Sequence, residues 1–95
     1  MGHRFFVYIL ANLRGAQPIL YTGVTNDPER RVAEHRLDPT GFVARYARLH
    51  SRRLECMTDS RVAIAREKRI KGWSRVRKMA LVESANPEWR DLLSR

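Results

Sequence analysis

Cysteine is almost absent from this sequence, in which Cys56 is the only one among 95 residues. A single cysteine excludes an internal disulfide and any metal cluster built on cysteines. Long apolar runs are absent as well, and none approaches the roughly 20 residues that a transmembrane helix needs. The apolar segment 5–11 follows Arg4 as a signal-peptide core would, but its aromatic and β-branched residues and the lack of an A-x-A-like cleavage site favour a buried strand. We therefore expect a cytoplasmic protein that does not associate with membranes.

Acidic residues are also scarce, because ten Asp and Glu stand against nineteen Lys and Arg and leave a net charge of +9. Sixteen of the nineteen cations are arginines, whose planar fork of donors fits phosphate oxygens. A surplus of this size in so short a chain predicts attraction to a polyanion, and hence to nucleic acid. Charge alone leaves open a soluble basic protein that binds nucleic acid only incidentally.

The first half of the chain predicts a hairpin followed by a helix. Two apolar segments, 5–10 and 19–24, are separated by one short turn, which indicates antiparallel pairing. The segment 26–29 (Asn-Asp-Pro-Glu) then combines a capping side chain, a proline at the first helical position and an acid in the first turn. We expect this helix to run to about Leu37.

The second half predicts one more strand and two more helices. A strand is expected over 49–57, and helices over 62–71 and 75–84, separated by Gly72 as a stop and Ser74 as a new cap. The segment 86–88 (Asn-Pro-Glu) is expected to open a last turn. The prediction is one domain, residues 1–95, with an α+β fold of order β-β-α-β-α-α, in which a small three-stranded antiparallel sheet is flanked by helices.

Glu67 is the residue that the helical pattern does not explain. With Ala63 at zero on a helical wheel, Ile70 lies about 20° to one side and Glu67 about 40° to the other. A carboxylate therefore lies on the face that should be apolar, where a lone charge would be costly. Its partner could be an arginine or a metal ion, and helical geometry does not decide between them.

Three further features carry possible chemistry. Arg31 and His35 are four residues apart on one helix face, where they could hold a phosphate and move a proton, although a solvated polar face explains them as well. Tyr8 and Tyr21 lie in the two paired strands, where tyrosines are usually part of the core. Gly23 lies inside a strand, which indicates a bulge or a close backbone approach.

Together these segments resemble the GIY-YIG nuclease family, in its compact single-domain bacterial form. Val7-Tyr8-Ile9 and Tyr21-Thr22-Gly23 are similar to the two motifs of the family name, and 24–35 is similar to the loop and helix that carry an arginine and a histidine one turn apart. The segment 63–71 resembles the one with the family's metal-binding glutamate, and Asn86 matches a C-terminal asparagine. The first motif lacks the leading glycine, and Thr22 replaces the usual isoleucine, but neither change removes a functional side chain.

The resemblance implies a role for each matching residue. Tyr8 and Tyr21 would stand beside the scissile phosphate, and one of them would help to deprotonate the attacking water. Arg31 would brace the phosphate, and His35 would assist proton transfer or hold a tyrosine hydroxyl. Glu67 would be the only protein ligand to Mg²⁺ or Mn²⁺, an arrangement that suits an ion which keeps several waters. Asn86 would help to shape the site. The implied activity is a metal-dependent endonuclease that hydrolyses phosphodiester bonds, acting on DNA rather than RNA and on branched or single-stranded substrates.

The remaining arginines and lysines suit a substrate channel. Seven cations stand against one acid between residues 66 and 78, and a second group (Arg45, Arg48, Arg52, Arg53) lies near Phe42 and Tyr46. Such a mixture fits a strand whose bases stack while its phosphates are neutralised, although a solvated face is an alternative. The residues expected to bind substrate are Gly23, Arg45, Arg66, Lys68, Lys71 and Asn86. The alternatives to a nuclease are a non-catalytic nucleic-acid-binding module on the same fold and a protein-interaction adaptor; we expect a monomer or weak homodimer.

Overall fold

The computed structural model describes residues 4–13, 19–37 and 50–93, and within the first helix it leaves the side chains of 32 and 34–37 undescribed. Its elements follow the order β1 (Phe5–Asn12), β2 (Ile19–Thr25), α1 (Pro28–Leu37), β3 (His50–Met57), α3 (Ser60–Lys71) and α4 (Arg75–Ala85). The three strands form one sheet of order β2-β1-β3, and β1 pairs antiparallel with both neighbours. The predicted α+β fold and its order of elements are confirmed.

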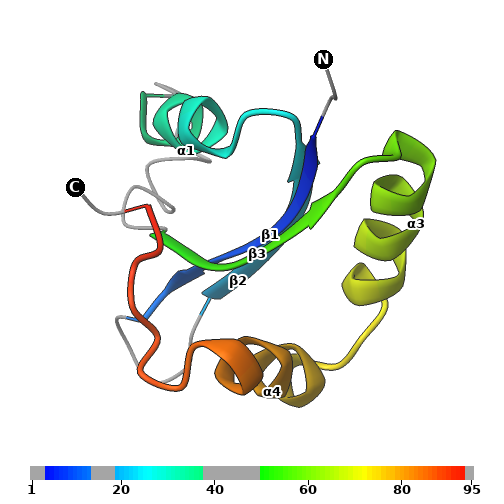
Figure 1. Ribbon diagram of the computed structural model, residues 1–95. Coiled ribbons are helices and arrows are strands. Elements are labelled where there is room, and N and C mark those ends of the chain that lie inside the picture. The colour runs from blue at the N-terminus through cyan, green and yellow to red at the C-terminus, as the bar shows by residue number, and fades with distance from the viewer. Residues whose placement is uncertain (1–3, 14–18, 38–49, 94–95) are drawn as a thin grey trace.

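The central strand β1 is buried on both faces, as its continuous apolar sequence predicts. On one face Val7 and Ile9 pack with Ala63, Ile70 and Val82 of α3 and α4, and both tryptophans contact this cluster. On the other face Tyr8 and Leu10 form a second cluster. In Figure 1 α1 lies above the sheet, whereas α3 and α4 lie to its right and below it.

Local capping signals determine where the helices begin and end. The Asp59 carboxylate accepts a hydrogen bond of 2.8 Å from the backbone N–H of Arg61, so α3 starts at Ser60, two residues before the predicted start. Gly72 ends α3, and the Ser74 hydroxyl accepts a hydrogen bond of 3.2 Å from the N–H of Arg77 to begin α4. The predicted stop and restart between the two helices is therefore confirmed.

The segment after α4 opens the predicted turn, in which the N–H of Trp89 donates to the carbonyl of Asn86 at 3.0 Å, and then returns to β3. Asn86 is the C-cap of α4, and its Nδ2 donates hydrogen bonds of 2.9 Å to the carbonyls of Arg52 and Arg90. Further along, the N–H of Leu92 donates to the carbonyl of Ser51 at 2.8 Å, and Leu93 packs against the Tyr8 cluster. Figure 1 shows this segment running back from α4 to the start of β3. Because Asn86 is held on both sides, it anchors the C-terminal segment to the sheet.

Glu55 on β3 makes the folded state sensitive to acid. It accepts hydrogen bonds of 2.9 and 3.1 Å from Arg66 and one of 2.9 Å from Arg53. Burial acts to raise the pKa of Glu55, but the hydrogen bonds from Arg66 and Arg53 outweigh it and lower that pKa below its ordinary value. A lowered pKa gives stability that is present above the unfolded-state pKa and lost as pH falls through the folded-state pKa.

We expect the free energy of unfolding to fall between about pH 5 and pH 3, and Glu55→Gln to remove part of that dependence. Urea unfolding at several pH values measures the free energy of unfolding of both proteins. Glu88→Gln is the matched control, since the Glu88 side chain is 66% exposed. An equal slope of stability against pH in wild type and Glu55→Gln would contradict the prediction.

Candidate active site

Two tyrosines meet on one face of the sheet. Tyr8 in β1 is paired with Gly23 in β2, and Leu10 is paired with Tyr21, so Tyr8 and Tyr21 are diagonal neighbours. Their ring centroids lie 6.3 Å apart, with an angle of 27° between the ring planes. Tyr8 is only 2% exposed, whereas Tyr21 is half-buried. The strand register alone thus brings both motif tyrosines together.

Gly23 provides the space for the Tyr8 ring. A Cβ atom at position 23 would lie 2.9 Å from Cε2 of Tyr8 and closer still to its Cζ and hydroxyl oxygen. Because real Cβ atoms do not approach other atoms so closely, any side chain at this position would displace the ring. The sequence predicted a bulge or a close approach here, and the structure shows a close approach by a side chain.

Arg31 approaches this pair from the first helix. The Asp27 carboxylate accepts a hydrogen bond of 3.1 Å from the N–H of Arg30, and the backbone N–H of Arg31 donates to the carbonyl of Asp27 at 3.0 Å, so the start of α1 is well defined. The Arg31 guanidinium hydrogen-bonds the hydroxyl of Tyr8. Burial raises the pKa of Tyr8, and the hydrogen bond with Arg31 and the charge of Lys71 only partly oppose that shift. The Tyr8 hydroxyl is therefore neutral at neutral pH, and its oxygen accepts the hydrogen bond from Arg31.

Glu67 lies on the buried face of α3, as the helical wheel predicted. It is 7% exposed, and the other buried residues of this helix are Ala63 and Ile70. The protein group that pairs with it is a lysine and not the arginine that the sequence suggested: Nζ of Lys71 lies 2.5 Å from Oε1 of Glu67. The hydrogen bond to Glu67 raises the pKa of Lys71, and the charges of Tyr21 and Tyr8 act on it in the same direction. The ammonium of Lys71 thus lies within electrostatic range of both tyrosines.

Sequence reasoning missed Lys71 as the partner of Glu67, although the signal was present. The two residues are four apart in a helix, a spacing at which a glutamate and a lysine meet on one face. Lys71 was predicted only as a substrate-binding residue. The structure places its ammonium against Glu67 and within electrostatic range of both tyrosines, and so the candidate site contains Tyr8, Tyr21, Arg31, Glu67 and Lys71.

The residues here fit a divalent cation of the hard, oxygen-binding kind. The buried Glu67 carboxylate supplies an anionic oxygen, and a cation, the Lys71 ammonium, lies at hydrogen-bonding distance from it. Within residues 4–13, 19–37 and 50–93 no group of three or more His, Cys, Asp or Glu side chains could hold a metal. Magnesium is often bound through one or two carboxylates and several waters, so a single glutamate is sufficient.

Other predicted site residues either lie outside the described part of the chain or make contacts elsewhere. The His35 side chain and all of Arg45 lie outside the described residues. Arg66 makes a two-point ion pair with Glu55 on β3. Two arginines of the second basic group are also used internally: Arg52 is 9% exposed and donates to the carbonyl of Trp89, and Arg53 binds Glu55 and the carbonyl of Leu81. For Arg52 and Arg53 the expectation of a substrate-facing surface was wrong, because the C-terminal segment and α4 cover β3.

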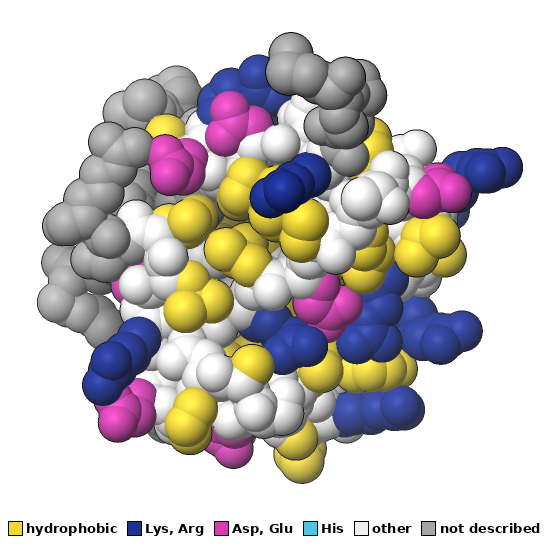
Figure 2. All heavy atoms as spheres, in the orientation of Figure 1, with side chains coloured by type: hydrophobic (Ala, Val, Ile, Leu, Met, Phe, Trp, Pro, Cys, Tyr) yellow, Lys and Arg dark blue, Asp and Glu magenta, His cyan; other side chains and the backbone are white. Residues whose placement is uncertain are grey.

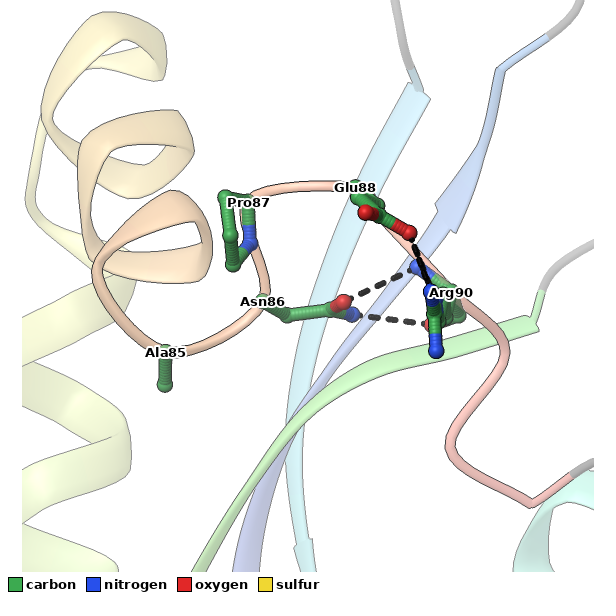
Figure 3. A pocket seen from close by; sticks show the side chains of 5 residues that line it. All are labelled: Ala85, Asn86, Pro87, Glu88 and Arg90. Atoms are coloured by element: carbon green, nitrogen blue, oxygen red, sulfur yellow. Dashed lines mark hydrogen bonds and ion pairs between the residues drawn. The ribbon is translucent and has the colours of Figure 1, made fainter.

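Asn86 lies at a separate surface pocket of about 240 Å³ lined by Ala85, Asn86, Pro87, Glu88 and Arg90. Figure 3 shows its amide directed toward Arg90, where Oδ1 accepts a hydrogen bond of 3.0 Å from the backbone N–H. Both amide hydrogens are donated to backbone carbonyls. Asn86 therefore acts on the site through the fold, by fixing the segment that packs Leu93 against Tyr8.

A basic surface surrounds the end of α3 and the start of α4. Its exposed members are Lys68, Arg69, Lys71, Arg75 and Arg77, named here the α3–α4 basic surface. Trp73 lies between the helices, with the guanidinium carbons of Arg77 and Arg66 at 3.9 and 5.2 Å from its ring centroid. Lys and Arg side chains gather at the lower right of Figure 2, over this part of the molecule. Cations are thus concentrated beside the Glu67–Lys71 pair.

Comparison with known protein families shows to which family the chain belongs. The model of the GIY-YIG catalytic domain matches residues 4–80. The chain belongs to the GIY-YIG nuclease family. Thr22, which replaces the usual isoleucine of the second GIY-YIG motif, is 4% exposed, and its hydroxyl has no hydrogen-bond partner in the described part of the chain. It occupies an apolar position and leaves Tyr21 and Gly23 in place.

Two curated relatives share most of this GIY-YIG chain. A UPF0213 protein of Haloquadratum walsbyi is 36% identical over 87 residues, which is 87% of this chain and 91% of the relative. A UPF0213 protein of Natronomonas pharaonis is 38% identical over 89 residues, covering 86% and 94%. No solved structure matches the chain. Among the described residues, no helix is both long enough and apolar enough to cross a membrane.

Proposed function

We propose that this GIY-YIG chain is a divalent-metal-dependent endonuclease that hydrolyses phosphodiester bonds of nucleic acid. We further propose that residues 1–95 act as one domain, as a monomer or weak homodimer, on DNA in preference to RNA and on branched or single-stranded sites. One observation carries the proposal: a buried carboxylate, Glu67, is paired with Lys71 near two tyrosines and beside a strongly basic surface. Binding alone does not need that carboxylate, because it repels phosphate unless a cation lies between them.

Each residue of the candidate site has a distinct task in this proposal. Glu67 would hold Mg²⁺ or Mn²⁺, which when bound would supply positive charge to the phosphate and to the leaving oxygen. Arg31 would place a fixed positive charge against the non-bridging oxygens, where negative charge develops as water attacks. The neutral hydroxyl of Tyr8 would donate a hydrogen bond, held in place by Arg31.

Proton transfer would fall to the residues that remain. The attacking water forms a bond to phosphorus while the bond from phosphorus to one sugar oxygen breaks, so a proton must leave the water and another must reach that oxygen. Tyr21 is only half-buried, and it would accept the proton from the water while it passes its own hydroxyl proton to His35, one turn after Arg31. A water molecule from solvent would protonate the leaving sugar oxygen. We propose that Gly23, Arg45, Arg66, Lys68, Lys71 and Asn86 support the substrate, the first and last of these by shaping the site.

The test is a cutting assay with purified protein on labelled single-stranded and branched DNA and on RNA of the same sequence. We expect cutting with Mg²⁺ or Mn²⁺ and none in chelator. Should the protein bind these substrates and cut none of them with any divalent metal, it is a nucleic-acid-binding module on the GIY-YIG fold.

Binding should weaken steeply with salt, because the α3–α4 basic surface displaces counterions from phosphates. If about four phosphates of a single strand are contacted, log K against log salt has a slope of about −3. Lys68→Met should make that slope shallower by about one, because one phosphate contact is lost. Fluorescence anisotropy in chelator measures the slopes.

Arg61→Gln is the matched control, because its side chain is 90% exposed but pairs with Asp59 at the opposite end of α3. A salt slope near zero in the wild type would refute a surface that follows phosphates. Equal changes from Lys68→Met and Arg61→Gln would show that net charge, and not this surface, sets the affinity.

A further inference from the structure

We propose that Lys71 is a displaceable counter-ion of Glu67, whose ammonium neutralises the carboxylate in the metal-free protein and competes with a divalent cation for it. The inference rests on the proposed function only in taking Glu67 as the ligand of that cation. It concerns how tightly the ion is held, and it can be measured without any cutting.

The burial of Glu67 makes a resident cation necessary. The Glu67 side chain is 10% exposed, and its neighbours on the buried face of α3 are Ala63 and Ile70. An ionised carboxylate in such surroundings is strongly disfavoured unless a positive charge and hydrogen bonds compensate it. Nζ of Lys71 lies 2.5 Å from Oε1 and provides both. In the absence of a metal ion, this contact keeps a charged carboxylate inside the fold.

The exposure of Lys71 makes that cation exchangeable. Its side chain is 54% exposed, it is the last residue of α3, and its ammonium ends a flexible four-carbon stem. The Glu55–Arg66 pair differs in both respects, because two hydrogen bonds join its side chains and these are only 15% and 27% exposed. A guanidinium held at two points is a fixed partner, whereas a single ammonium near solvent can leave. Glu67 thus has the kind of partner that an incoming ion can replace.

Competition has a measurable consequence for affinity. A cation that binds Glu67 must first separate the ammonium from the carboxylate, so part of its binding free energy is spent on breaking the pair. The displaced ammonium also stays close enough to repel the bound ion. Removing the charge of Lys71 should therefore tighten metal binding. The Lys71 ammonium can move outward when it leaves Glu67, because it is one of the exposed cations of the α3–α4 basic surface.

The test is Mn²⁺ binding to the substrate-free protein, measured by the electron paramagnetic resonance signal of the free ion. We expect Lys71→Met to bind Mn²⁺ about three to ten times more tightly than wild type. Lys71→Arg keeps the charge and should stay close to wild type. Lys68→Met removes a neighbouring exposed charge and should change affinity less than two-fold, while Glu67→Gln should abolish the site.

Thermal unfolding provides the second readout and checks that the variants fold. In chelator Lys71→Met should melt below wild type, because its buried carboxylate has lost the paired ammonium. Mn²⁺ should then raise the melting temperature of Lys71→Met by more than it raises that of wild type, because the variant binds the ion more tightly.

Three results would overturn the inference: equal or weaker Mn²⁺ binding by Lys71→Met, an equal gain in Lys68→Met, or no Mn²⁺ binding by any variant. The cutting assay separates this outcome from the proposed function. If the wild type cuts with Mn²⁺ but Lys71→Met binds the ion no more tightly than wild type, the proposed function stands and the counter-ion proposal is refuted. If Lys71→Met binds Mn²⁺ more tightly but the wild type never cuts, the counter-ion proposal stands and the proposed function is refuted.

Discussion

Glutamine in place of Glu67 is expected to abolish metal-dependent cutting while nucleic-acid binding stays close to wild type. Glutamine has nearly the same shape, so the packing of α3 on the sheet is kept, but it has no charge with which to hold a divalent ion. The loss should be at least about a thousand-fold in cutting rate, since ion and charge stabilisation are lost together. Folding should survive, because replacing one member of a buried pair by a neutral side chain leaves only the half-exposed Lys71 unpaired.

The measurement compares cutting rates at saturating Mg²⁺ or Mn²⁺ with substrate affinities in chelator. Glu88→Gln is the control, because it changes net charge equally at a side chain that is 66% exposed. Cutting by Glu67→Gln at more than a few per cent of the wild-type rate would exclude Glu67 as the essential ligand. A parallel loss of substrate binding would mean that Glu67 acts on the fold or the binding surface.

Alanine at position 23 should impair the protein by a different route, through Tyr8. A Cβ there would overlap the Tyr8 ring, which is 2% exposed and packed against Leu10, so the ring must leave its position. Moving it breaks the hydrogen bond between the Tyr8 hydroxyl and Arg31. Displacement of a reacting group by about 1 Å can cost a hundred-fold in rate, and we expect a loss of that order. Overpacking should also lower the free energy of unfolding by about 1–3 kcal/mol.

Gly72→Ala is the matched control, because a Cβ there would meet its nearest atom at 3.5 Å and the backbone φ is −78°. It should leave the cutting rate unchanged and the stability unchanged or slightly higher. Urea unfolding of Gly23→Ala, Tyr8→Phe and the double variant tests the cause: the double variant should lose less than the sum, since Tyr8→Phe removes the closest atom. Strictly additive losses, or wild-type cutting by Gly23→Ala, would refute the assigned contact.

Local patterns in the chain predicted most of the fold. The unbroken apolar segment from Phe5 predicted a central strand, and β1 is buried on both faces. Ser74 and Gly72 marked the boundary between α3 and α4, because caps and stops act within one turn of the backbone. Asn86 shows how far such reasoning reaches. Its Asn-Pro sequence predicts the start of a turn, and the N–H of Trp89 donates to the Asn86 carbonyl at 3.0 Å, as that prediction requires. The contact of its amide with distant Arg52 is visible only in the fold.

In the candidate site, too, some features follow from local sequence and others from the fold. The placement of Glu67 on a buried helix face follows from the order of residues alone, since the angle between positions on a helix is constant. Likewise the net charge of +9 is a property of composition. Composition does not tell which arginines face solvent. Arg52, Arg53 and Arg66 have internal partners because α3, α4 and the C-terminal segment pack on β3.

The sequence by itself thus determined the elements, their order and the charge of the surface, all of which depend on neighbours a few residues apart. Only the tertiary structure decided that Gly23 makes room for Tyr8, that Arg31 reaches its hydroxyl and that the Glu67–Lys71 pair lies near the tyrosines. These contacts depend on strand register and on how the helices dock. A shift of one residue in register would turn Tyr21 to the opposite face of the sheet, with no change in any local pattern.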